Sequence, residues 1–187
     1  MPLEMMNQVN KEQAENRVVR NNKTKKIKEI DIKKILSGIN SNNYDELYPA
    51  LLLASGRKPG DLWKREIKRG NKPNSIKIKS KLTKRANDCT IEYSVPLLTS
   101  FRVFSKGIKK LRELQPTMNV KKNANALLLI SQLYDIKLTA SDIRIIYVNK
   151  VFSISDDNEI PFSEWVVNFL DHDTVEPKLN YNKITII

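Results

Sequence analysis

The sequence contains one cysteine and one histidine among its 187 residues. A single cysteine excludes an internal disulfide and a cysteine-based zinc cage, and a single histidine excludes a metal site built from several histidines. Five glycines are present, and none stands in a G-x-G or G-x-x-x-x-G-K arrangement, which argues against a glycine-rich nucleotide-binding loop. We therefore expect no metal or nucleotide cofactor.

Long apolar runs are also lacking. No apolar run approaches the length that spans a membrane, and the opening residues, MPLEMMNQVN, contain no signal-like apolar stretch. The expectation is an intracellular protein without a membrane partner, located in the cytoplasm or nucleoid, or in the host nucleus if the source is viral. Apolar residues make up 40% of the chain, which is enough for one globular core at this length.

Positive charge is abundant and unevenly distributed. Lysine and arginine number 33 against 21 acidic residues, a net charge of +12, and residues 57–85 carry twelve of the basic side chains against two acidic ones. A concentrated basic segment predicts a polyanionic partner, most often a nucleic acid, because each neutralised phosphate releases counterions. The alternative is a solvated lysine-rich face without a ligand. The residues that we expect to contact the nucleic acid are Lys58, Lys64, Lys79, Lys84 and Arg85.

Apolar residues recur at helical spacing over most of the chain, and the pattern changes between Asp61 and Pro96. There, short segments of alternating or β-branched character are separated by polar stretches, as expected of an antiparallel sheet. The expected helices cover residues 29–39, 43–56, 97–115, 123–134, 139–152, 161–172 and 176–184, and the expected strands cover residues 62–67, 75–81 and 89–95. The predicted fold class is mainly α with a small antiparallel three-stranded β-sheet.

The two ends of the chain have distinct patterns. Residues 1–28 are polar and basic without sustained apolar periodicity, so we expect an N-terminal arm that contributes little to the core, followed by one domain over residues 29–187. The final residues, NKITII, include four β-branched side chains and predict a short strand that joins a sheet edge. That edge belongs either to the same chain or to a neighbouring protomer, and the second case would give a homo-oligomer.

A protein that cleaves a phosphodiester without a metal needs a nucleophile, cations around the phosphorus and an acid for the leaving oxygen. Arginine is suited to the non-bridging oxygens because its guanidinium group binds them through two parallel hydrogen bonds, which lysine cannot do. Five candidates for these roles occur along the chain. They are Arg57 in LLLASGRKPGDL, Lys81 in IKIKSKLTKR, Arg144 in LTASDIRIIYVNKVF, His172 in FLDH and Tyr181 in KLNY.

This order and these contexts resemble the catalytic domain of the tyrosine recombinase and phage integrase family. The resemblance covers residues from about 30 to 187, and it includes the nine-residue interval between His172 and Tyr181. Where the family usually has the histidine of His-x-x-Arg this chain has Ser141, and where it usually has a glycine before the later histidine this chain has Asp171. Lys84 is the second choice for the hairpin lysine.

The resemblance implies a metal-independent enzyme that acts on double-stranded DNA. Tyr181 would form a 3′-phosphotyrosyl intermediate, Arg57, Arg144 and His172 would stabilise the transition state, and Lys81 would protonate the leaving oxygen. The implied outcome is site-specific recombination or integration, with telomere resolution and type IB topoisomerase activity as alternatives because they use the same chemistry. DIRIIYVNKVF looks more like telomere resolvases and divergent viral recombinases.

Two other classes of protein stay open. The first is a DNA-binding protein that retains the fold without turnover, which Ser141 and Asp171 favour. The second is an RNA-binding module, which is less favoured because no aromatic residues interleave the basic run. Tyr93 and Tyr147 are rival phenols for the nucleophile, but both lie in patterns that indicate packing.

Overall fold

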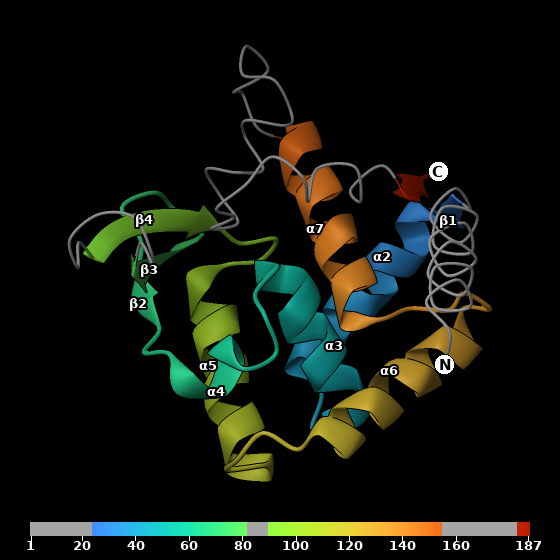
Figure 1. The fold of residues 1–187 in the computed structure, drawn as a ribbon, viewed down its shortest axis with the longest axis horizontal. Coiled ribbons are helices and arrows are strands. Elements are labelled where there is room, and N and C mark those ends of the chain that lie inside the picture. The colour runs from blue at the N-terminus through green and yellow to red at the C-terminus, as the bar shows by residue number, and fades with distance from the viewer. Residues whose placement is uncertain (1–23, 82–89, 155–182) are drawn as a thin grey trace, which may run out of the picture.

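The structure, a computed structural model, describes residues 24–81, 90–154 and 183–187. Its helices form one body, with a three-stranded sheet against one side and a two-stranded sheet near the opposite side (Figure 1). The helices are α2 (Glu29–Ser37), the 3₁₀ helix η1 (Gly38–Asn40), α3 (Tyr44–Ser55), α4 (Asp61–Lys64), α5 (Phe101–Leu114), α6 (Val120–Leu133) and α7 (Ala140–Ile154). The strands are β1 (Lys25–Ile27), β2 (Lys68–Arg69), β3 (Ser75–Lys81), β4 (Thr90–Pro96) and β5 (Ile184–Ile186). The predicted fold class is confirmed.

Helix α3 is the centre of the core. Ten of its twelve residues are buried, and it contacts α2, α5, α6 and α7. A helix that is apolar on most sides has to be enclosed by other elements, and these four helices enclose it. The helix begins at Asn43, whose side chain accepts a hydrogen bond from the Asp45 backbone N–H at 3.0 Å.

Helix α7 packs against α3 and starts with a reciprocal cap. The Thr139 hydroxyl accepts a hydrogen bond from the Asp142 N–H at 3.2 Å, and the Asp142 carboxylate accepts one from the Thr139 N–H at 2.9 Å. These two bonds satisfy backbone donors that the first turn of a helix leaves without intrahelical acceptors. The cap therefore fixes where α7 begins, and with it the position of Arg144 one turn later.

The antiparallel sheet has the order β2-β3-β4. Its longer pairing runs from Ser75 opposite Pro96 to Lys81 opposite Thr90. The expected first strand at residues 62–67 is wrong, because its first three residues lie in α4 and β2 begins at Lys68. The short apolar pattern around Leu62 was ambiguous between strand and helix, and burial of Leu62 in the helical core favours the helix.

The second sheet joins the two ends of the described chain. Strand β1 pairs in parallel with β5, with Lys25 opposite Ile184 and Ile27 opposite Ile186. The predicted C-terminal strand is thus confirmed, and its edge belongs to the same chain. Residues 25–27 fall inside the expected arm of residues 1–28, yet Ile27 is 2% exposed and belongs to the core. The fold therefore includes the strand from Lys25 onward.

The helices expected at residues 161–172 and over most of 176–184 lie outside the described residues. Within the described ranges, none of the helices combines the length and apolar character required to cross a membrane.

Candidate functional site

Arg57 lies directly after the central helix. Helix α3 ends at Gly56, which has a left-handed backbone (φ 60°) and donates its N–H to the Leu52 carbonyl at 2.8 Å. Glycine adopts this conformation without steric cost, and it is the residue that most often ends a helix in this way. The turn directs the chain back to the core, so Arg57 is only 5% exposed. Such burial is unusual, because arginine side chains are mostly exposed in folded proteins.

The end of α3 meets α7 close to Arg144. A Cβ atom on Gly56 would lie 2.0 Å from Cδ1 of Tyr147, so the glycine backbone is in direct contact with that ring. Tyr147 follows Arg144 by three residues, which is about 4.5 Å along a helix axis. The close approach of Gly56 therefore brings the segments that carry Arg57 and Arg144 together.

Strand β4 ends at the same junction. The Tyr147 hydroxyl donates a hydrogen bond to the Pro96 carbonyl at 2.7 Å, and the Leu98 N–H donates to the Ala54 carbonyl at 2.9 Å. Tyr147 is 0% exposed, so its expected packing role is confirmed. The ends of α3 and β4 thus meet α7 close to the two arginines. The Tyr147 hydroxyl joins α7 to β4.

The two arginine side chains differ in exposure but share one property. Arg57 is buried and Arg144 is half-buried. In both, Nε is buried and has no hydrogen-bond acceptor within the described residues, although each residue makes a further interaction. Guanidinium groups on adjoining elements can bind an oxyanion through several charge-assisted hydrogen bonds. The junction therefore brings together two segments that each carry an arginine.

Gly56 offers a direct test of this junction. We expect Gly56→Ala to lower the free energy of unfolding by about 2–4 kcal/mol, because alanine is strained at φ 60° and its methyl group would displace the Tyr147 ring. Gly60→Ala is the matched control, since Gly60 has φ −61° and a Cβ there meets no atom within 4 Å. The control should change stability by less than about 1 kcal/mol. Equal losses in denaturant titrations of the two variants would contradict this account.

The remaining predicted site residues are placed as follows. Ser141 lies on α7 nearly one turn before Arg144 and is exposed. Lys79 and Lys81 lie opposite Glu92 and Thr90 in the β3–β4 pairing. The position of Lys81, six residues along the strand from Ser75, is about 20 Å from the end of the hairpin that adjoins the arginine junction. Lys84, Arg85, His172 and Tyr181 lie outside the described residues.

Basic side chains are exposed around α4 and the strands that follow it. The exposed residues of this group are Lys58, Lys64, Lys68, Arg69 and Lys72. Arg112 of α5 holds the segment around α4 by donating hydrogen bonds to the Leu62 carbonyl at 2.9 Å and the Arg65 carbonyl at 2.7 Å. Burial lowers the pKa of Arg112. Sequence reasoning missed this positioning role, because nothing in the pattern of α5 separates Arg112 from a solvated arginine.

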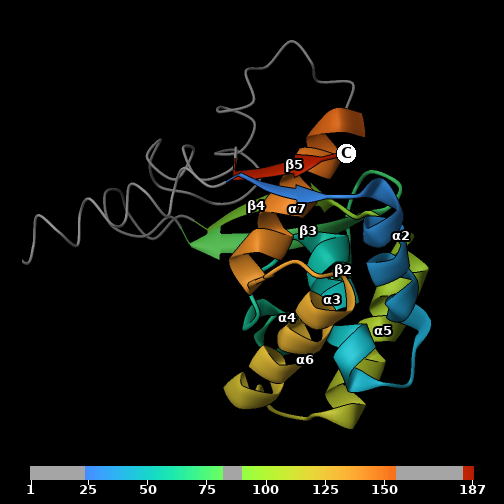
Figure 2. The ribbon, with the colours of Figure 1, turned by 90° about the vertical axis from the view of Figure 1, so that its right-hand side faces the viewer.

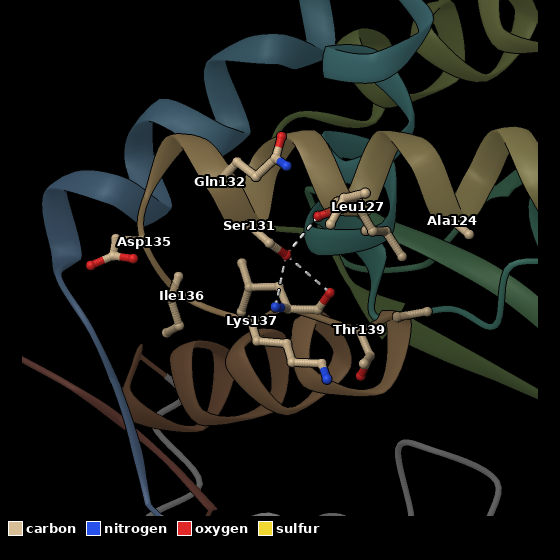
Figure 3. A pocket seen from close by; sticks show the side chains of 11 residues that line it. Ala124, Leu127, Ser131, Gln132, Asp135, Ile136, Lys137 and Thr139 are labelled. Carbon is tan, nitrogen blue, oxygen red and sulfur yellow. Dashed lines mark hydrogen bonds between the residues drawn. The ribbon is translucent and has the colours of Figure 1, made fainter.

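A pocket of about 540 Å³ lies elsewhere, between α6, the following loop and the start of α7 (Figure 3). Its lining is mostly apolar, and the Ser131 hydroxyl bridges its wall by donating to the Leu127 carbonyl at 2.7 Å and accepting from the Leu138 N–H at 2.9 Å. Neither predicted arginine lines it. The described ranges also hold no group of three or more histidine, cysteine, aspartate or glutamate residues that could bind a metal ion.

No protein-family profile matches the chain, and no curated protein matches it. Solved structures of protelomerases do match its fold over its whole length. Protelomerase TelK complexed with substrate DNA matches with a TM-score of 0.76 and 15% identity, and the chain covers 42% of that protein. Protelomerase TelA covalently complexed with substrate DNA matches with a TM-score of 0.70 and 15% identity, and the chain covers 67% of that protein.

The chain therefore shares its fold with part of the protelomerases. A variant of TelA complexed with a DNA hairpin product matches as well, with a TM-score of 0.72, 13% identity and 67% coverage of that chain. The resemblance expected from the sequence is confirmed for the fold.

Proposed function

We propose that this protein breaks and rejoins DNA strands through a covalent 3′-phosphotyrosyl intermediate, with Tyr181 as the nucleophile. The observation that carries the proposal is the meeting of the Arg57 and Arg144 segments at one junction, in a fold shared with proteins captured in covalent complexes with DNA. The order of the five candidate residues along the chain supports it further.

The chemistry divides among the candidates by type. The Tyr181 hydroxyl oxygen attacks the phosphorus, and the bond between the phosphorus and the 5′-oxygen breaks. Arg57, Arg144 and His172 donate hydrogen bonds to the non-bridging oxygens, where negative charge builds in the transition state. Lys81 is assigned the protonation of the leaving 5′-oxygen from its place in the order of candidates along the chain, not from a described contact with the arginine junction. The phosphotyrosyl ester keeps the energy of the broken bond, so rejoining needs no nucleotide and, in this assignment, no metal.

Double-stranded DNA is the proposed partner, and the exposed lysines around α4 are proposed to contact its backbone together with Lys79, Lys84 and Arg85. Contacts of this kind are electrostatic and independent of sequence, so binding should weaken steeply as salt is raised. Exposure of Lys58 and Lys64 is consistent with this role.

The outcome of rejoining depends on which strand end attacks the intermediate. Joining to a partner duplex gives recombination, and joining a strand to its own complement gives a hairpin telomere. Telomere resolution is the favoured outcome, because a matching structure is that of a protelomerase complexed with a DNA hairpin product. Site-specific recombination is the second candidate.

The experiment that tests the proposal uses supercoiled plasmid and a library of duplexes with inverted repeats, incubated in excess EDTA and quenched with detergent. We expect a covalent protein–DNA adduct with a free 5′-hydroxyl that a polynucleotide kinase can label. Telomere resolution additionally predicts products that renature at once after heating. Salt-sensitive binding with no adduct on any of these DNAs would identify a DNA-binding protein without turnover.

A further inference from the structure

The last described strand is held at its first residue by α7. The Asn149 side-chain amide donates a hydrogen bond to the Ile184 carbonyl at 2.8 Å. Ile184 is 2% exposed and belongs to the core. This bond joins the start of β5 directly to the helix that carries Arg144, five residues or about 7.5 Å away along the axis.

Strand β1 holds β5 from its other side. The Ile187 N–H donates to the Ile27 carbonyl and the Glu29 N–H donates to the Ile187 carbonyl, both at 2.9 Å, in addition to the parallel pairing. Figure 2 shows the two strands side by side next to α7. Strand β5 is therefore held between β1 and α7 of the same chain.

Two ion pairs fix β1 and its continuation to α7 on either side of Arg144. Lys25 contacts the Asp142 carboxylate at 2.7 Å, and Lys150 contacts the Glu29 carboxylate at 2.8 Å. All four side chains are at least partly shielded from solvent. The pairs limit sliding of the two-stranded sheet along the helix, so the carbonyl that Asn149 binds has a defined place relative to Arg144.

The distance from this anchor to the proposed nucleophile is short. Tyr181 precedes Ile184 by three residues, and three residues span at most about 11 Å even when fully extended. We propose that Asn149 is a positioning residue for Tyr181: by holding the Ile184 carbonyl, it limits how far the tyrosine can lie from an anchor on the helix that carries Arg144. This inference rests on the proposed function, because it presupposes that Tyr181 is the nucleophile.

The variant that tests it is Asn149→Asp, which keeps the size of the side chain, removes the donor and places a carboxylate against the Ile184 carbonyl. Ser153→Ala is the matched control, because Ser153 is a polar residue on the same helix whose hydroxyl bonds to the Lys150 carbonyl within α7. We measure the rate of adduct formation on the cleavable DNA, the affinity for the same duplex and the melting temperature.

We expect Asn149→Asp to slow adduct formation about 100-fold with unchanged duplex affinity, since a small misplacement of a reacting group has an effect of that order. The control should match the wild type. A wild-type rate in Asn149→Asp would overturn the inference and leave the proposed function intact. Absence of an adduct in the wild type itself would overturn both.

A cross-strand disulfide separates positioning from a loss of stability. Lys26 and Thr185 are partners in the β1–β5 register and both are exposed. Adjacent strands are about 4.8 Å apart, which a disulfide can bridge. The variant combines Lys26→Cys and Thr185→Cys with Cys89→Ser and Asn149→Asp. Oxidation should restore at least about 10-fold of the lost rate if the defect is in the position of β5. No recovery on oxidation, with an intrachain disulfide verified, would overturn the inference.

Discussion

Tyr181→Phe should abolish the covalent protein–DNA adduct while leaving duplex affinity unchanged. The substitution removes one hydroxyl oxygen, and that oxygen forms the bond to phosphorus in the proposed reaction. No other group in the assignment can replace it, so the expected effect is complete loss and not a reduced rate. The measurement is a detergent-quenched adduct assay, together with a binding titration at one fixed salt concentration.

Tyr134→Phe is the matched control. Tyr134 is half-buried and follows α6, and burial, with the nearby Asp31 and Glu46 carboxylates, raises its pKa. A phenol with a raised pKa is a poorer nucleophile at neutral pH, so this variant should form the adduct as the wild type does. Persistence of the adduct in Tyr181→Phe would reject Tyr181 as the nucleophile and direct attention to another phenol.

Arg57→Lys and Arg144→Lys should each slow adduct formation about 100- to 1000-fold, the effect of removing one donor from a preorganised oxyanion site. Lysine keeps the positive charge but lacks the planar fork that binds two phosphate oxygens at once. Because charge is retained, duplex affinity and its salt dependence should change little. Single-turnover rates at saturating protein measure the chemical step without a contribution from binding.

Arg102→Lys is the control for this pair, since Arg102 is exposed in the first turn of α5. It should cleave at the wild-type rate. An equal, modest decrease in the rate of adduct formation in all three variants would contradict a special role for the guanidinium groups at the α3–α7 junction. A general electrostatic contribution to DNA binding would then account for the decrease.

The sequence predicted most of the architecture because the relevant signals are local. The leucine-rich run ending in Gly56 specified both the central helix and the left-handed residue that ends it. The period-two pattern around Ile76 likewise specified β3. The error at Leu62 arose because a short apolar segment fits both the helical and the strand periodicity. Burial of Leu62 in the helical core favours the helix.

The contacts that assemble the candidate site were not predictable in the same way. The approach of Gly56 to Tyr147 joins two helices far apart in the sequence, and a single sequence carries no signal for such a pair. The same holds for Asn149 and its bond to Ile184, since an asparagine inside a helix usually contacts solvent. The order of Arg57, Arg144 and Tyr181 was visible only through the resemblance to a known family.

The pairing of β1 with β5 also has a consequence for biosynthesis. These strands lie at opposite ends of the described chain, so their contact cannot form until translation has passed Ile186 and that strand has left the ribosome. Contacts between such distant segments form slowly, because a very long loop must close first. The nascent chain would thus hold its basic surface and both arginines before its tyrosine is tethered.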